Sequence, residues 1–159
     1  MRSALLIAVL VTTSATADPI RWTTSTCGGS TIDIPQFMTE SAVRGLIKSG
    51  EEEPYGTVFQ PEGYLILLRQ YYMEYSKRPY RYISGNVDNI NVTYKIDKPN
   101  VGIVSGSVFG GKEIFFGMCT KSDKLHCFDV FYSAKEKAKY GPIVKRIAKS
   151  FRESSRGCL

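Results

Sequence analysis

Short apolar runs fill most of the chain after residue 30 and are separated by polar turns. We expect strands at residues 31–35, 57–60, 64–71, 91–98, 101–108, 113–118 and 125–132. Each run is four to eight residues long and ends near glycine, proline or a polar cluster, which is typical of strands. From residue 91 onward four of them follow one another with short links, and this succession predicts an antiparallel sheet.

After residue 133 the pattern changes to a helical period. Ser133 and Glu136 match a capping box at the helix start, and Gly141-Pro142 predicts an interruption after which the helix restarts. One apolar stripe of this segment contains Tyr140, Ile143, Val144, Ile147, Ala148 and Phe151. Residues 72–89 could hold a short helix, and residues 39–54 are expected to form a loop with at most one helical turn.

These patterns predict an α+β fold. An antiparallel β-sheet of about six to seven strands would pack against a C-terminal amphipathic helix and one or two short helices. With 159 residues the chain has room for one domain, which we expect to span residues 31–159.

The first 17 residues have the pattern of a secretory signal peptide. Arg2 gives a positive start, residues 4–11 are an unbroken apolar run, and the segment ends Ala15-Thr16-Ala17. The apolar run is shorter than the roughly 20 residues that span a bilayer, and no later segment approaches that length. We therefore expect cleavage between Ala17 and Asp18, an extended leader at residues 18–30, and export to the periplasm or the extracellular medium.

The four cysteines are Cys27, Cys119, Cys127 and Cys158. An even number in an oxidising compartment indicates disulfides. Cys119 and Cys127 flank a polar turn between two expected strands, so a bridged hairpin is predicted, and Cys27 with Cys158 would then join the two ends of the domain. The alternative is a zinc site of three cysteines and His126, but the spacing matches no usual zinc pattern. We expect no metal and no cofactor.

Positive charge is concentrated near the end of the chain. The formal net charge is +6, and residues 134–156 contain eight basic and two acidic residues. A candidate basic face on the helix consists of Lys145, Arg146, Lys149 and Arg152. Such a face can meet an anionic membrane or an acidic polymer, or it can be an ordinary solvated helix face. An exported protein rarely meets nucleic acid, so nucleic acid is not an expected partner.

A second candidate contact surface is a cluster of aromatic and cationic residues. It consists of Tyr72, Tyr75, Arg78, Tyr80, Arg81 and Tyr82. Such residues together can bind a sugar, a peptide or a lipid headgroup. The alternative is a connecting segment whose tyrosines half-cover the edge of the sheet.

Residues 92–151 carry a family resemblance. The segments VTYK, IVSG, GKEIFFGMC, HCFDVFYSAKEK and YGPIVKRIAKSF follow one another there, after TIDIP and GTVFQPEGYLILLRQY nearer the N-terminus. This order resembles small exported proteins of α-proteobacteria with the PsbP/DcrB-like fold. The resemblance implies an antiparallel sheet packed against helices, and it implies no established reaction, cofactor or catalytic residue.

The sequence shows no catalytic motif. His126 is the only histidine, and we expect it at an exposed or edge position rather than as a catalytic base. The carboxylates at residues 51–53, Glu62 and Asp123 lie in expected loops or turns. We therefore predict a non-catalytic exported accessory or binding module that meets an envelope or extracellular protein or an anionic surface. The alternatives are a peripheral binder of anionic membrane or acidic polymer through the basic helix, and an enzyme with an unrecognised site.

Overall fold

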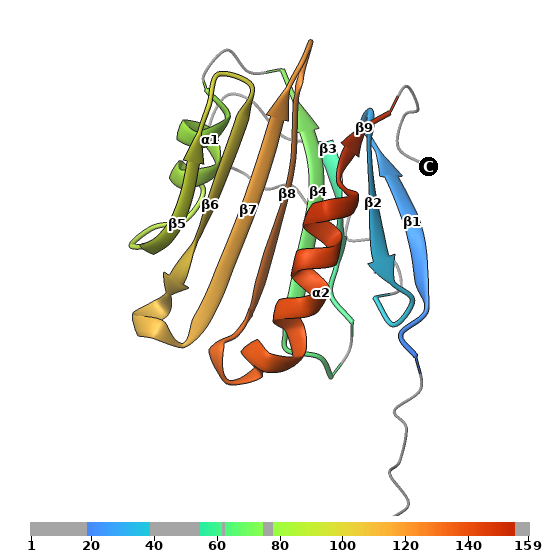
Figure 1. Ribbon diagram of the computed structural model, residues 1–159, viewed down its shortest axis with the longest axis vertical. Helices are drawn as coiled ribbons and strands as arrows, with labels where there is room; N and C mark the ends of the chain where they lie inside the picture. Colours follow the sequence, from blue (N-terminus) through green and yellow to red (C-terminus); the bar gives the residue numbers. More distant parts are fainter. Residues whose placement is uncertain (1–18, 39–54, 62, 75–77, 155–159) are drawn as a thin grey trace, which may run out of the picture.

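A six-stranded antiparallel sheet forms the centre of the protein in the computed structural model (Figure 1). The structure describes residues 19–38, 55–61, 63–74 and 78–154. The strand order is β3-β4-β8-β7-β6-β5. Their bounds are β3 (Tyr55–Phe59), β4 (Ile66–Met73), β5 (Asn91–Asp97), β6 (Val101–Val108), β7 (Glu113–Lys121) and β8 (Leu125–Ser133). The expected strand meander and the hairpin within residues 57–71 are confirmed.

A smaller sheet has the strand order β1-β2-β9. Its strands are β1 (Trp22–Cys27), β2 (Ser30–Pro35) and β9 (Arg152–Glu153). β1 lies within the segment expected to be an extended leader. Apart from Trp22 and Cys27 it contains only threonine and serine, so its sequence has no apolar pattern that predicts a strand. It forms because β2 supplies a hydrogen-bonding partner along its whole length. Gly28 and Gly29 both take positive φ values in the turn between them.

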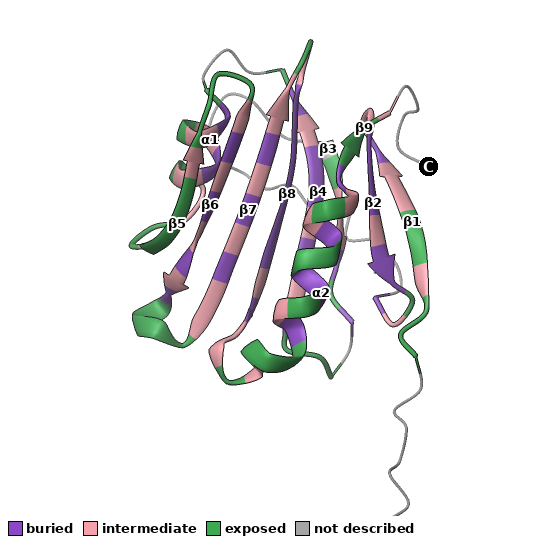
Figure 2. Cartoon of the chain, viewed as in Figure 1, coloured by how far each residue is buried: buried purple, intermediate pink, exposed green. Residues whose placement is uncertain are grey.

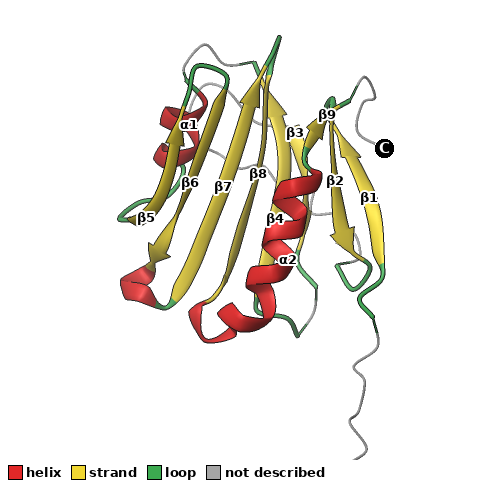
Figure 3. Cartoon of the chain, in the orientation of Figure 1, coloured by secondary structure: helices red, strands yellow, loops and turns green. Residues whose placement is uncertain are grey.

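The helices lie on opposite faces of the large sheet (Figures 1 and 3). α1 (Pro79–Gly85) packs on one face, and its formation confirms the short helix expected within residues 72–89. α2 (Lys137–Ser150) covers part of the other face together with the small sheet. Two 3₁₀ turns complete the described elements, η1 (Phe109–Gly111) and η2 (Ala134–Glu136). The predicted α+β class, with its C-terminal helix, is thus confirmed.

β8 shows why the two faces have separate cores. Successive side chains of a strand point to opposite faces. Phe128 and Val130 accordingly pack towards α2, while Cys127 and Leu125 pack towards α1. Both sets are buried, which explains the nearly continuous apolar run of this strand.

α2 differs from the expectation at its start. η2 precedes it, Ser133 makes no side-chain capping bond, and the helix continues through Pro142 without a restart. A proline inside a helix leaves the carbonyl four residues earlier without its donor. Here both Pro142 and Ala138 are exposed, so water can satisfy that carbonyl. Burial of Tyr140, Ile143, Val144 and Ile147 holds the helix together across this position.

Several expectations concern residues that are not described. The signal peptide at residues 1–17, the cleavage site at Ala17 and Asp18, and the loop at residues 39–54 lie outside the described residues. Among the helices of the described part of the chain, none is long and apolar enough to cross a membrane.

Candidate functional site

α2 covers only part of its face of the large sheet, and the half formed by β5, β6 and β7 is left open (Figure 2). Strand register places six side chains on this open face: Tyr94, Ile96, Ile103, Ser105, Phe116 and Met118. Each of them remains partly or fully accessible, whereas Val104 and Phe115 on the opposite face are buried. The molecule therefore presents an apolar sheet surface to solvent next to α2.

A groove of about 360 Å³ lies between α2 and this open face. Ile103, Phe116 and Met118 form its floor on the sheet, and Val144 and Ala148 contribute apolar atoms from α2. Lys145 and Lys149 also line the groove, one helical turn apart on the same side of α2. The groove thus combines an apolar floor with two cations.

The four residues of the candidate basic face have different environments and contacts in the structure. Lys145 and Lys149 are exposed beside the groove, and neither forms an ion pair with any described residue. Arg146 instead stacks over the indole ring of Trp22, with its guanidinium carbon 4.0 Å from the ring centroid. Arg152 belongs to β9 and donates a hydrogen bond of 3.0 Å to the carbonyl oxygen of Ser150. Only the two lysines are brought together at a cavity.

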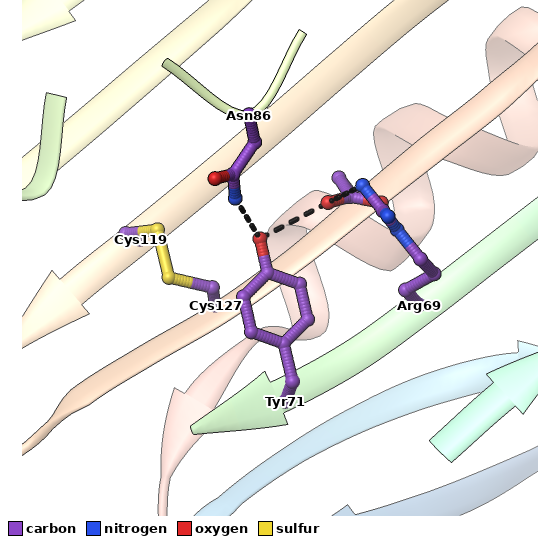
Figure 4. The surroundings of a disulfide bond; sticks show 6 residues. Arg69, Tyr71, Asn86, Cys119 and Cys127 are labelled. Atoms are coloured by element: carbon purple, nitrogen blue, oxygen red, sulfur yellow. Dashed lines mark hydrogen bonds and ion pairs between the residues drawn. A yellow bond between two sulfur atoms is a disulfide. The ribbon is translucent and has the colours of Figure 1, made fainter. Parts of the chain in front are cut away.

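A buried polar network lies on the other face of the sheet, beside α1 (Figure 4). The Arg69 guanidinium donates two hydrogen bonds to the Asp129 carboxylate, of 2.6 and 2.7 Å. The Tyr71 hydroxyl donates to the same carboxylate at 3.0 Å and accepts from the Asn86 amide at 3.1 Å. Because these groups satisfy one another, the network joins β4, β8 and the segment after α1 rather than forming an open site.

The electrostatics of this network follow from its burial. Burial raises the pKa of the Asp129 carboxyl above its ordinary value, while the Arg69 guanidinium and its hydrogen bonds act in the opposite direction. Burial lowers the pKa of Arg69, but the charge and hydrogen bonds of Asp129 outweigh it and the net shift is upward. Burial and then the Asp129 charge raise the pKa of the Tyr71 hydroxyl well above its ordinary value. Tyr71 therefore stays protonated and keeps donating.

The raised pKa of Tyr71 predicts a loss of stability in alkali. Above the ordinary tyrosine pKa of 10.0 the unfolded chain releases this proton and the folded chain keeps it. The free energy of unfolding should therefore be unaffected by Tyr71 below pH 10 and should fall above it, by about 1.4 kcal/mol per pH unit. Urea unfolding of Tyr71→Phe between pH 9 and 11 should show a shallower decline than the parent protein, by about one proton.

Tyr94→Phe is the matched control for this measurement, because Tyr94 is 52% exposed and lies on the open sheet face. It should decline with pH as the parent protein does. Equal slopes for the parent protein and Tyr71→Phe would contradict the prediction.

The sequence did not predict this network, although it contained a signal. Arg69 lies within ILLRQYYM and Asp129 within LHCFDVFYS, so each charge stands inside an apolar strand. An unpaired buried charge is costly, and two opposite charges in such settings suggest a pair. Only the register of β4 against β8, which places Arg69 directly opposite Asp129, shows that they meet.

One predicted disulfide is present. Cys119 and Cys127 face each other across β7 and β8, with Cα atoms 4.1 Å apart, and they are bonded. Cys27 is fully buried and also disulfide-bonded. Cys158 lies outside the described residues, so the Cys27–Cys158 pairing stays a prediction.

His126 is not at the exposed or edge position that we expected. It lies on the central strand β8, only 4% exposed, and its ring packs against the Gly28-Gly29 turn of the small sheet. Its Nδ1 has no hydrogen-bond partner in the described structure, and Asp123 lies 3.9 Å from its Nε2. The imidazole therefore lies beneath the small sheet rather than in an open site.

The tyrosine and arginine cluster is divided between the two faces of the sheet. Tyr72 points towards the small sheet, with the Lys124 ammonium 5.3 Å from its ring centroid. Tyr80 and Tyr82 belong to α1 and pack against the core on the opposite face. Arg78 and Arg81 are exposed beside them, and Tyr75 lies outside the described residues. The described members therefore do not form one surface.

The remaining candidate groups assemble no reaction centre in the part of the chain that is described. No group of three or more His, Cys, Asp or Glu side chains is placed there to hold a metal ion. Asp123 lies in an exposed turn, and hydrogen bonds from Ser122 and the Lys124 amide lower its pKa. Residues 51–53 and Glu62 lie outside the described ranges.

Comparison with known proteins gives no further guide. No protein-family model matches the chain, and no curated protein matches it significantly.

Proposed function

We propose that the protein is a non-catalytic exported binding module whose ligand site is the groove between α2 and the open half of the sheet. The ligand class that fits is an apolar chain with an anionic group. The observation that carries this proposal is the apolar floor of the groove beside Lys145 and Lys149, whose charges no described residue neutralises.

The two parts of the groove favour two parts of such a ligand. Ile103, Phe116 and Met118 are only partly covered by the protein, so an apolar chain lying on them would remove their remaining apolar area from water. A carboxylate or phosphate next to Lys145 and Lys149 would form charge-assisted hydrogen bonds, which are stronger than neutral ones. Pockets of this composition, mostly apolar with a few polar groups, are typical small-molecule sites.

Export is supported by two further features. Disulfides persist in oxidising compartments, and the protein contains a disulfide between Cys119 and Cys127. The sequence of residues 1–17 has the pattern of a signal peptide. Together they favour a function outside the cytoplasm.

Calorimetric titration with dodecanoate tests the ligand site. We expect dodecanoate to bind, while dodecyltrimethylammonium, which has the same chain and the opposite charge, binds at least tenfold more weakly. Lys145→Gln/Lys149→Gln should weaken dodecanoate binding by roughly tenfold, since two charge-assisted contacts are lost. Ala148→Trp should abolish binding by filling the groove. Lys95→Gln is the matched control, because Lys95 is exposed on β5 and its register partner Val104 lies on the opposite face.

Two results would contradict this proposal. Equal affinity for the anionic and the cationic amphiphile would show that Lys145 and Lys149 do not contact the charged group of the ligand. Unchanged binding in Ala148→Trp, with the folded state verified by circular dichroism, would place the ligand elsewhere.

A further inference from the structure

Three connections meet at one end of the large sheet, the lower end in Figure 1. They are the β3–β4 turn, the β6–β7 turn that contains η1, and the junction between β8 and α2 that contains η2. Backbone hydrogen bonds join them: the Ser133 amide donates to the Leu65 carbonyl at 3.1 Å, and the Ala134 amide donates to the Lys112 carbonyl at 2.9 Å. The three connections therefore form one continuous surface, which we call the turn end.

Large apolar side chains project from the turn end into solvent. Phe109 is 66% exposed and Leu65 is 62% exposed, while Tyr64 beside them is 40% exposed and its ring stacks on that of Phe37. They border a hollow of about 410 Å³ whose apolar lining also includes Phe131. Exposed apolar groups gathered at one place mark interaction surfaces in folded proteins.

The backbone at Phe109 adds an independent observation. Its φ is +49°, a left-handed conformation that costs energy for any residue with a Cβ atom. A glycine adopts a positive φ without this cost, as the next residue, Gly110, does with a φ of +67°. The fold thus holds a residue in a costly conformation in this turn, and the aromatic ring of that residue is exposed to solvent rather than packed in the core.

The turn end also has an excess of positive charge. Its exposed lysines are Lys112 and Lys135 in the connections, together with Lys137 and Lys139 in the adjoining first turn of α2. Within the described residues none of them takes part in an ion pair. The Lys139 ammonium lies over the ring of Tyr64, 5.3 Å from its centroid. Against these four lysines the three connections contain three acidic residues: Glu113 and Glu136, which are partly buried, and Glu62, which lies outside the described residues.

We propose that the turn end docks on an anionic membrane surface. Phe109 and Leu65 would enter the boundary between headgroups and acyl chains, where exposed aromatic and aliphatic side chains of peripheral proteins lie. The four lysines would contact anionic headgroups, because the negative surface potential of such a membrane attracts clustered lysines. This combination of apolar side chains bordering a hollow with surrounding cations fits a lipid surface, because acyl chains and headgroups can adapt to an uneven surface.

This surface differs from the groove and from the candidate basic face. Lys145 and Lys149 belong to the groove, and Arg146 packs on Trp22. Variants at the turn end and at the groove therefore test membrane docking and ligand binding separately.

Vesicle sedimentation tests the docking. The disulfide-intact protein is mixed with sucrose-loaded vesicles of phosphatidylcholine, with or without 30% phosphatidylglycerol, at low and high salt. We expect binding to the anionic vesicles only, weakened at least tenfold at high salt because the lysine contacts are screened. All variants carry the same N-terminus, so residues 1–17 cannot account for differences among them.

Two sets of variants examine the two components of the surface. Phe109→Gly/Leu65→Ser should lower the vesicle partition coefficient at least tenfold by removing the apolar tips. Phe109→Gly alone should not unfold the protein, because glycine adopts the positive φ without strain. Lys112→Gln/Lys137→Gln should lower the coefficient roughly tenfold or more and reduce the dependence on salt. Lys95→Gln/Lys98→Gln and Val92→Ser, which change a pair of exposed lysines and an exposed apolar residue outside both the groove and the turn end, should leave it unchanged.

Several outcomes would overturn the docking proposal. Among them are equal binding to neutral and anionic vesicles, absence of binding at low salt, and unchanged binding in Phe109→Gly/Leu65→Ser. Loss of binding in Lys145→Gln/Lys149→Gln alone would assign the membrane contact to the groove side of α2 instead. Binding to soluble polyglutamate without binding to vesicles would indicate an acidic protein partner.

Discussion

Arg69→Met is expected to destabilise the folded protein by about 3–5 kcal/mol, a large part of the total stability of a domain this size. The substitution keeps the apolar stem of the side chain and removes the cation. The Asp129 carboxylate, which is fully buried, would then lack both its charge partner and two of its hydrogen bonds. Urea unfolding at pH 7 with the disulfides intact measures the effect.

The pH dependence of this variant should reveal its cause. Without Arg69 the pKa of the buried Asp129 carboxyl rises further above its ordinary value of 3.8, so the folded state binds a proton that the unfolded state releases. A carboxyl shifted in this direction makes the folded protein less stable as the pH rises above 3.8. The deficit of Arg69→Met relative to the parent protein should therefore be smaller at pH 5 than at pH 8.

The double variant Arg69→Met/Asp129→Leu provides the control. It removes both charges, and replacing a whole buried pair is often far less costly than breaking it. We expect it to be at least as stable as Arg69→Met alone. Measured together with Asp129→Leu, the double variant completes a cycle that gives the coupling between the two side chains, which we expect to be strong. A change of less than 1 kcal/mol in Arg69→Met would contradict the prediction.

Gly102→Val is expected to destabilise the protein by about 3 kcal/mol through displacement of α1. A Cβ atom at Gly102 would lie 2.2 Å from the backbone nitrogen of Tyr80 and 2.5 Å from the carbonyl carbon of Pro79. Backbone atoms cannot turn aside as the end of a flexible side chain can, so the helix must move away from β6. Overpacking of this kind typically costs 1–3 kcal/mol, and we expect the upper end because a helix backbone is displaced.

Gly141→Ala is the matched control for this substitution. A Cβ atom at Gly141 would meet nothing within 4 Å, and the residue lies inside α2. Alanine restricts the unfolded chain and favours the helix, so this variant should gain roughly 0.5–1 kcal/mol. Thermal and urea unfolding of both variants should therefore shift in opposite directions. A Gly102→Val protein as stable as the parent would show that α1 does not rest on this strand.

Glycines also show the limit of sequence reasoning on this fold. In the sequence, Gly102 and Gly106 only lower the strand propensity of an otherwise largely apolar segment. In the structure they are the positions where other backbone segments approach β6: α1 at Gly102 and Asn91 of the edge strand β5 at Gly106. Close approach of this kind is a pairwise property of two segments, so a single strand pattern cannot reveal which neighbour requires the glycine.

The sequence by itself determined the local features of this protein. Alternating apolar residues and turn residues predicted the strands of the large sheet, and the polar turn between Cys119 and Cys127 predicted the bridged hairpin. The apolar stripe of α2 was also predicted from the sequence, whereas the residue at which the helix starts was not. These features depend on residues that are close in the chain, whose spacing directly reflects the period of a strand or a helix.

Only the tertiary structure decided the features that join distant residues. Arg69 and Asp129 are 60 residues apart and meet because β4 pairs with β8 in one register. The groove exists because α2 packs over β8 and against β2, leaving the face of β6 and β7 uncovered. Phe109 and Leu65 reach one surface because three separate connections end on the same side of the sheet. Periodicity shows which face of an element is apolar, but what covers that face depends on how the elements pack, and packing is decided by the whole chain.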